Sequence, residues 1–465
     1  MLSVKPRAKG TALLEGNETR LQRSKTKGLG GRMETDLEKR TLRKITRRLI
    51  PFCMVLFILN YIDRVNIGFA ALQMNRELGF SPTVYGLGAG IFFIGYFFFE
   101  IPSNLILEKI GARLWIARIA ITWGIISTAM AWVYNETSFY VMRFLLGIAE
   151  AGLLPGLLLY FSYWFPARQR ARALALFMTA TAISNIIGAP LSTSLLGLDG
   201  LFGLRGWQLM FVIEGVPSII MGVVVLRYLT DRPAQANWLT DDEKAWLNHI
   251  LTAERAAKEE TSGRMTLKLG LISPRVLLIA LLCFFLVSGN FGVVFWLPQI
   301  IKGFGGLTNM QVGLLATVPY ILAAFAMVWW GHHSDRTGDR KWHLAIAALI
   351  GAAGLAGSAL LTSSPASFAA LCIAAIGIWS MFGVFWALPT DLLSGIAAAG
   401  GFALINSIGN LGGFAGPFLV GFVRERSGNF SASLLVLAVF VLVSALLAAL
   451  LPSQPKMQSA VVPAK

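Results

Sequence analysis

Charged residues are scarce in this chain. They make up 14% of its 465 residues, whereas soluble domains contain about 25%. Hydrophobic residues make up 55% and the mean hydropathy is +0.65, so the chain has too few polar groups to cover a surface that faces water. This composition argues against a soluble enzyme. Twelve membrane spans of about 21 residues would need roughly 250 residues, a share that suits the apolar fraction. We therefore expect an all-α polytopic membrane protein.

Cysteine and histidine are also scarce. The cysteines are odd in number, far apart and set in apolar segments, so we interpret them as packing residues: Cys53, Cys283 and Cys372. The histidines fall in loops or at the ends of apolar runs: His249, His332, His333 and His343. The sequence therefore predicts neither a metal site nor a cofactor.

Long apolar runs predict twelve transmembrane helices in two pseudo-symmetric six-helix bundles. The first six lie at roughly 48–73, 84–108, 113–134, 138–162, 171–196 and 207–229. The last six lie at roughly 276–301, 310–332, 343–362, 366–390, 397–423 and 430–451. These runs define five segments: a basic tail (1–47), a first bundle (48–229), a linker (230–275), a second bundle (276–451) and a second tail (452–465).

Basic residues cluster at the start of the chain. Residues 1–48 hold fourteen Lys or Arg against five Asp or Glu, a net charge of +9 out of 40 − 24 = +16. Such a cluster before an apolar span holds an N-terminus in the cytoplasm beside anionic lipid, and we do not expect a nucleic-acid partner. No cleavable signal peptide is evident. We expect a disordered tail, with Met33 as a second candidate start of translation.

The turns on the side of the N-terminus hold most of the remaining basic residues, among them Lys109, Arg113, Arg168, Arg170 and Arg172. This distribution predicts that both termini lie in the cytoplasm, and we expect a bacterial cytoplasmic (inner) membrane protein. The linker, with seven acidic and seven basic residues, contains WLTDDEKAWLNHIL, which predicts an amphipathic surface helix.

Two loops at equivalent places repeat one pattern. NLILEKIGAR (104–113) follows the second span and GHHSDRTGDR (331–340) follows the eighth. Both have an acid, a base, a glycine and an arginine at the same spacing. This match indicates a duplication, an architecture in which a binding site forms where the repeats meet.

A few charged residues fall inside the apolar spans, where each costs about 2.5–3.5 kcal/mol at mid-bilayer. Asp63 and Arg64 lie in the first span, and Arg143 and Glu150 lie in the fourth. Arg143 and Glu150 are two helical turns apart on one face, with Gly147 between them as a notch for a helix or a substrate. If the two spans pack together, the four groups form a neutral set around one polar cavity.

Such a set could bind an anion and move protons. Arginine offers a planar, permanently charged fork that fits a carboxylate, and a poorly hydrated carboxyl group can exchange a proton near neutral pH. The alternative is a set of ion pairs that only fixes helix packing, and we favour that role for Glu100 and Glu214. Aromatic and amide side chains could complete the cavity or serve in packing: Tyr61, Tyr96, Trp386 and Asn406.

These motifs resemble a known family. The loop repeat resembles the loop motif of the major facilitator superfamily, with Asp335, Arg336 and Arg340 in its key positions. The first copy is looser, since it has Asn104, Glu108, Lys109 and Ala112 where glycine, aspartate and two arginines are usual. NYIDRVNIGFA, PSNLILEKIGARLWIAR and RFLLGIAEAGLLPG resemble the anion:cation symporter branch, most closely its tartrate-transporter-like members, over roughly residues 43–425.

The resemblance implies roles for matching positions. Asp63 and Glu150 would carry protons, Arg64 would bind the substrate carboxylate, and Arg143 would balance the charge of Glu150. Substrate contacts would come from Tyr61, Tyr96, Trp386 and Asn406. The gating loops would use Glu108, Lys109, Gly111, Arg113, Asp335, Arg336 and Arg340. Two departures, Phe291 for tyrosine and Thr181 for an amide, favour a small acid with few hydroxyls.

We therefore expect a monomeric transporter in the lipid bilayer that imports a small organic anion, such as a tartrate-like dicarboxylate, with protons by alternating access. An anion exchanger or an efflux transporter is the alternative. A membrane enzyme or a receptor is disfavoured, because the sequence shows neither a catalytic constellation nor an output domain. The motifs specify neither the anion nor the number of protons.

Overall fold

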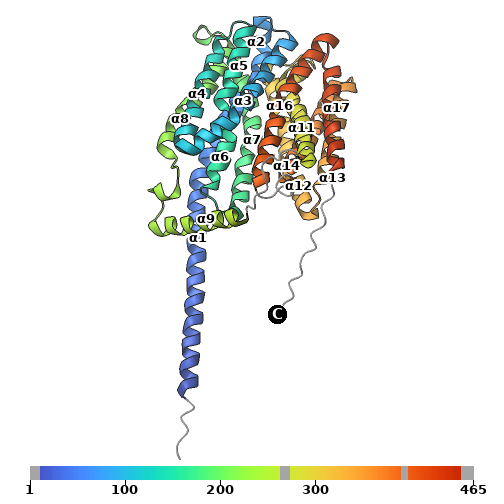
Figure 1. Cartoon of the computed structure of the whole chain (residues 1–465). Coiled ribbons are helices and arrows are strands. Elements are labelled where there is room, and N and C mark those ends of the chain that lie inside the picture. Colours follow the sequence, from blue (N-terminus) through green and yellow to red (C-terminus); the bar gives the residue numbers. More distant parts are fainter. Residues whose placement is uncertain (1–10, 262–272, 389–395, 452–465) are drawn as a thin grey trace, which may run out of the picture.

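The computed structural model describes residues 11–261, 273–388 and 396–451, and the side chains of α1 from Asp36 onward. Two groups of long helices stand side by side (Figure 1). The first half consists of α1 (Thr11–Val65), α2 (Ile67–Leu78), α3 (Pro82–Ile110), α4 (Ala112–Ala129), η1 (Met130–Trp132), α5 (Glu136–Glu150), α6 (Leu153–Ser162), α7 (Ala167–Leu196), η2 (Leu201–Gly203) and α8 (Gly206–Tyr228). The second half consists of α11 (Pro274–Lys302), α12 (Asn309–Thr337), α13 (Lys341–Leu360), α14 (Ser364–Phe385), α16 (Ile396–Ser427) and α17 (Phe430–Leu450).

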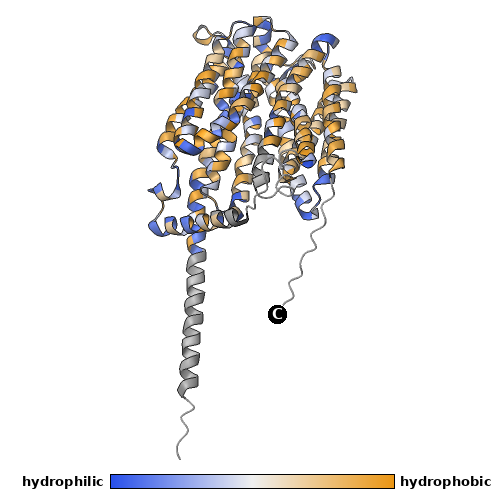
Figure 2. Cartoon of the chain, viewed as in Figure 1, coloured by the Kyte–Doolittle hydropathy of each residue, from blue (hydrophilic) through white to orange (hydrophobic). Residues whose placement is uncertain are grey.

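Eleven of the helical segments are long and apolar enough to cross a membrane, and α16 completes the twelve. Hydrophobic residues predominate along the helices of the bundle, while hydrophilic residues gather at its ends and on the helix below it (Figure 2). The all-α fold with twelve membrane helices is thus confirmed. The three cysteines are free and buried.

Two of the spans are interrupted close to charged residues. The first span breaks at Asn66, between α1 and α2, and the fourth breaks at Ala151 and Gly152, between α5 and α6. Gly152 has φ +88°, a left-handed conformation that glycine adopts without strain. Interrupted helices in membrane transporters free backbone groups beside a binding site.

Small residues allow the helices to approach closely. A Cβ atom at Gly147 would overlap the main-chain oxygen of Phe92, so α3 fills the notch on α5. Across the halves, α3 packs on α16, α7 on α12 and α2 on α11. Gly86 and Gly90 of α3 lie against the backbone of α16. Tight backbone approach of this kind supplies the packing that lipid does not drive.

The linker carries η3 (Pro233–Gln235) and α9 (Asp241–Thr261), which confirms the expected helix in this region. Figure 1 shows α9 lying across the lower end of the first half, beside α1. We refer to this end as the α9 end and to the opposite end, where α2 lies, as the α2 end. α1 begins at Thr11, so the structure has helix where we expected a disordered tail. No proline lies between positions 6 and 51 to interrupt the helix.

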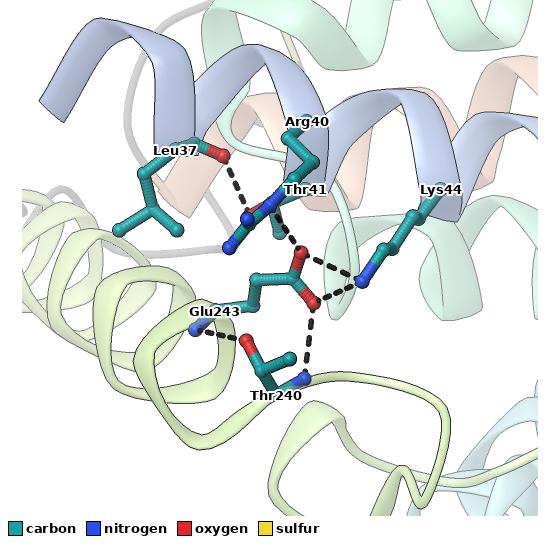
Figure 3. A network of polar contacts seen from close by, with 6 residues as sticks. All are labelled: Leu37, Arg40, Thr41, Lys44, Thr240 and Glu243. Carbon is teal, nitrogen blue, oxygen red and sulfur yellow. Dashed lines mark hydrogen bonds and ion pairs between the residues drawn. The ribbon is translucent and has the colours of Figure 1, made fainter. Parts of the chain in front are cut away.

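An acidic residue of the linker fastens α9 to α1 (Figure 3). Glu243, whose side chain is fully buried, accepts hydrogen bonds from Arg40 Nε at 3.0 Å and Lys44 Nζ at 2.9 Å. Thr240 N also donates to its carboxylate at 3.0 Å. Farther along α9, Glu254 accepts from Ala167 N at the start of α7. These bonds tie the linker to the first half.

Candidate substrate and proton site

The centre of the first half holds a buried ion pair between α1 and α5. Arg64 Nη2 donates to Glu150 Oε2 at 2.8 Å, and Arg64 Nε donates to the same oxygen at 3.1 Å. Glu150 is fully buried and Arg64 is 9% exposed. Each residue stands at or next to the end of its helix, immediately before a break. These two predicted residues are therefore in direct contact, although α1 packs mainly on α7 and α8.

Aromatic rings of α3 line the pair. The Arg64 guanidinium lies 5.2 Å from the ring centre of Phe92 and 5.3 Å from that of Tyr96, within the range of cation–π attraction. Tyr61 is buried one turn before the pair on α1. Tyr61 and Tyr96 therefore lie near Arg64, as expected for cavity residues.

Arg143 is fully buried, but it does not pair with Glu150. Its Nε and Nη2 donate to the main-chain oxygens of Gly88 and Ala89 at 3.3 Å, and its guanidinium faces the ring of Phe92. Within the described parts of the chain, no carboxylate lies within 4 Å of it and its Nη1 has no hydrogen-bond partner. Its positive charge is thus balanced only at longer range.

Asp63 faces away from this site. It accepts hydrogen bonds from Trp123 Nε1 at 2.9 Å, Ser127 Oγ at 2.8 Å and Ser218 Oγ at 2.7 Å, on α4 and α8. The expectation of one cavity shared by all four charged groups is wrong on this point. Neighbouring residues point about 100° apart around a helix, and α4 and α8 provide three donors on the side that Asp63 faces.

The predicted contacts from the second half lie elsewhere. Asn406 and Asn410 of α16 both donate to the carboxylate of Glu100 on α3, so Asn406 serves a bond between the halves. Trp386 follows α14 and is 38% exposed, with its ring against Phe385. The structure therefore does not bring Asn406 or Trp386 to Arg64 by any contact between described residues.

Two small cavities, one between the halves and one within the second half, are lined by polar residues that the sequence analysis did not single out. Each has a volume of about 10 Å³, near the minimum for one water molecule. Asn185 lines one cavity, Asn290 and Trp379 line the other, and Tyr320 lines both. The sequence could have indicated Asn185 and Asn290 as cavity residues, because each is an asparagine inside an apolar run.

The two departures from the family pattern have structural counterparts. Thr181 stands where the family has an amide side chain. Asn185, one helical turn further along α7, supplies an amide and donates to the main-chain oxygen of Thr181 at 2.9 Å. Phe291 packs on Phe93 with ring centres 4.6 Å apart, in the contact between the two halves. This position thus contributes an aromatic surface in place of a hydroxyl.

The repeated loops each stabilise the start of the following helix. In the first copy, Gly111 ends α3 with φ +98°, and a side chain there would meet Asp231, which accepts from Arg113 N at 2.8 Å. In the second copy, Asp339 accepts from Trp342 N at 3.1 Å, and Arg340 pairs with Asp335. The remaining predicted gating residues of these two loops are exposed: Glu108, Lys109 and Arg336.

Bonds at the α2 end join the halves. Glu425 of α16 accepts hydrogen bonds from Ser81 Oγ and Thr83 N, both at 2.8 Å, at the start of α3. Tyr85 Oη donates to the main-chain oxygen of Phe295 at 2.8 Å. The ion pairs found in the loop motifs stay within one half: Arg113 with Asp231, and Asp335 with Arg340.

Two six-helix halves with a buried charged pair near their interface are the architecture of a secondary transporter. The chain belongs to the Major Facilitator Superfamily, whose sequence pattern matches residues 53–417 and 306–465.

Relatives support the same class. The chain is 52% identical over 427 residues to an Agrobacterium vitis protein named "Putative tartrate transporter", covering 92% of this chain and 94% of that protein. It is 42% identical over 407 residues to the "Quinolone resistance transporter" of Acinetobacter baumannii, covering 88% and 94%.

Solved structures share the fold. The inward open conformation of the xylose transporter XylE from E. coli has a TM-score of 0.70 at 16% identity, with 89% of this chain and 98% of that chain covered. A bacterial homolog of the human lysosomal transporter Spinster, inward-facing and unoccupied, has a TM-score of 0.70 at 18% identity, with 87% and 96% covered. The protein is a multi-pass membrane transporter.

Proposed function

We propose that this protein imports a small organic dicarboxylate of the tartrate type together with protons, by alternating access. The names of its relatives, at 52% and 53% identity, support this substrate class. The buried pair of Arg64 and Glu150 is the observation that carries the mechanism. The α9 end would face the cytoplasm of a bacterial cell, across its inner membrane, because the basic start of the chain lies there, and the transporter would act as a monomer.

The Nε and Nη2 edge of Arg64 cannot bind a substrate carboxylate while both of these nitrogens donate to Glu150. Protonation of Glu150 would neutralise that carboxyl group and weaken both hydrogen bonds, because charge-assisted bonds are roughly twice as strong as neutral ones. The same edge of the guanidinium would then be free to bind a carboxylate of the incoming anion. Substrate and proton would thus bind together. Protonation of Glu150 releases Arg64 for the anion, and an anion bound to Arg64 leaves Glu150 free to hold its proton.

Arg143 would assist without touching the substrate. Its charge is balanced by no nearby carboxylate among the described residues, so it would favour an anion in the neighbouring site and disfavour a cation. Asp63 would hold a second proton on the other side of α1. A dianion that enters a negative-inside cell works against about 2.3 kcal/mol per charge for each 100 mV, and two protons would remove that opposition.

Uptake of labelled tartrate into proteoliposomes tests this function. The membrane potential is clamped at zero with potassium and valinomycin, and the outside is made acidic. We expect tartrate to accumulate above its outside concentration when the pH gradient is present and only to equilibrate when it is absent. Uptake that is indifferent to the gradient would contradict proton symport.

Exchange or efflux is the second candidate, favoured by the relative named as a quinolone resistance transporter. Quinolone export by this chain would require a site that accepts a much larger ring-bearing molecule. Liposomes loaded with unlabelled tartrate at equal pH on both sides measure exchange alone. If tartrate moves only under this condition, the protein is an exchanger.

A further inference from the structure

A further buried carboxyl group lies on α8 and has no role in the mechanism above. Glu214 is 5% exposed. Its Oε1 accepts a hydrogen bond from Ser192 Oγ at 2.7 Å, and its Oε2 accepts one from Asn66 Nδ2 at 2.9 Å. Over the ranges that the structure covers, no lysine, arginine or histidine nitrogen lies within 4 Å of it. Its hydrogen bonds therefore come from neutral donors.

Glu214 and Asp63 belong to one ladder between α1 and α8. Asn66, just after the end of α1, is three residues beyond Asp63 and keeps a helical backbone, and Glu214 and Ser218 are four apart on α8, so each pair lies on one side. Asn66 donates to Glu214, and Ser218 donates to Asp63 at 2.7 Å. Both acids thus lie between the same two helices, and neither has a nearby cation among the described residues.

Burial among neutral hydrogen-bond partners favours the protonated, uncharged form of Glu214 over the ionised form. An ionised side chain at the middle of a bilayer costs about 2.5–3.5 kcal/mol, whereas a protonated acid that is hydrogen-bonded avoids most of that cost. A carboxyl group that serves only in packing would need hydrogen-bond partners for one protonation state alone. The partners of Glu214 suit both forms.

Asn66 is the partner that can serve either form. Its Nδ2 now donates to Glu214, while its Oδ1 is buried and has no hydrogen-bond partner in the described structure. If the amide rotates by half a turn, Oδ1 can accept a hydrogen bond from a protonated Glu214. The Ser192 hydroxyl can likewise rotate between donating and accepting. The site therefore keeps its hydrogen bonds whether or not the proton is bound.

Asn66 also places this acid next to the substrate site. It stands at the break between α1 and α2, two residues after Arg64. A change in the bond between Asn66 and Glu214 therefore acts on the interruption of the helix that carries the anion-binding guanidinium.

We propose that Glu214 is a further proton-binding site of the transport cycle, which takes up and releases one proton per anion and communicates with the site at Arg64 through Asn66. This inference rests on the proposed proton symport. It adds one proton to those assigned to Glu150 and Asp63.

The proton number can be measured directly in proteoliposomes. At zero potential, a pH gradient of one unit balances a tartrate gradient of ten to the power of the proton number. The tartrate gradient at which no net flux occurs gives that number. We expect Glu214→Gln to lower the balancing gradient tenfold relative to the wild type. Ser194→Ala on α7, which removes a hydroxyl that bonds the main-chain oxygen of Leu191, should leave it unchanged.

Exchange of tartrate at equal pH shows that each variant is folded. Glu214→Gln keeps the size of the side chain, and its amide can donate to the unpartnered Oδ1 of Asn66. An exchange-competent Glu214→Gln with the wild-type balancing gradient would overturn the inference and leave the proposed function intact. A wild type whose balance ignores pH would overturn the proposed function itself.

Glu214→Asp supplies a second test, since it retains a titratable group at this position. We expect it to exchange tartrate and to keep the wild-type balancing gradient. A tenfold loss in this variant would contradict the assignment, because the acid is still present.

Discussion

Glu150 receives both hydrogen bonds of Arg64 on a single oxygen, Oε2, while Oε1 accepts none from the described residues. The side chain of Asn60 lies beside the pair, with Oδ1 3.5 Å from Arg64 Nη2 and with its own Nδ2 unpartnered. A proton can therefore bind Oε1 without first breaking a hydrogen bond. This asymmetry favours a pair that opens on protonation over one that is permanently closed.

Arg64→Ala should abolish tartrate binding and uptake. It removes the only guanidinium placed to bind the substrate in the proposed mechanism, and a charged hydrogen bond contributes about 1.5–3 kcal/mol, or roughly a 10- to 150-fold change in affinity. Calorimetry on the purified protein measures the affinity. The exposed Arg76→Ala serves as the control and should bind as the wild type does. Near-normal binding by Arg64→Ala would remove the role assigned to this residue.

Glu150→Gln should stop accumulation driven by a pH gradient but preserve exchange of internal for external tartrate. The amide resembles the protonated acid, so Arg64 stays available to the anion while the coupled proton is lost. Parallel uptake and exchange assays in proteoliposomes check this prediction. If accumulation by this variant still follows an imposed gradient, Glu150 is not the coupling group.

Gly147→Leu should destabilise the first half. Any side chain at this position meets the main-chain oxygen of Phe92, and overpacking of this kind costs about 1–3 kcal/mol. The thermal unfolding temperature of the purified protein should fall. Gly331→Leu on α12 is a matched control, because nothing described lies within 4 Å of a Cβ atom there. Equal effects at the two positions would show that close packing of α3 on α5 is not the cause.

Docking of α9 on α1 should depend on pH through Glu243. Burial raises the pKa of this carboxyl group, but hydrogen bonds from Lys44 and Thr240 N and the charges of Lys44 and Arg40 outweigh it, so its pKa lies below the usual value. A lowered pKa means that the ionised group stabilises the folded state above the pKa of an unfolded glutamate, about 4.3. That stabilisation is lost as the pH falls through the lower folded value.

Limited proteolysis of α9 measures this docking. At pH 7, Glu243→Gln should be cleaved faster than the wild type, and the difference should shrink as the pH falls below about 4. Asp242→Asn, an exposed neighbour on the same helix, should behave as the wild type at both pH values. A rate for Glu243→Gln that equals the wild-type rate at pH 7 would show that the ion pairs do not hold the linker.

The sequence alone predicted the helices well, because long apolar runs have one stable arrangement in a membrane. It also indicated that Arg64 would find a partner on the fourth span. It could not show the breaks at Asn66 and at Gly152, since each lies in a run whose composition continues on both sides. At the first break Asn66 donates to Glu214, and at the second a side chain in place of Gly152 would meet Ser103.

The sequence also could not predict that Asp63 and Arg64 would have partners on different helices. Asp63 and Arg64 are adjacent, and only the positions of α4, α5 and α8 decide which faces a carboxylate and which faces hydroxyl groups. Asn406 was expected to contact substrate but serves Glu100. That partner comes from the packing of α3 on α16, a contact between segments about 300 residues apart, as the spacing of 306 shows.

The number of protons taken up when tartrate binds tests the central claim most directly. Calorimetry in two buffers that differ in ionisation enthalpy gives this number for the purified protein. If Glu150 must be protonated before Arg64 can bind the anion, the wild type should take up about one proton more than Glu150→Gln at a pH where the carboxylate is ionised. Equal uptake by the two proteins, with tartrate bound to both, would contradict the account.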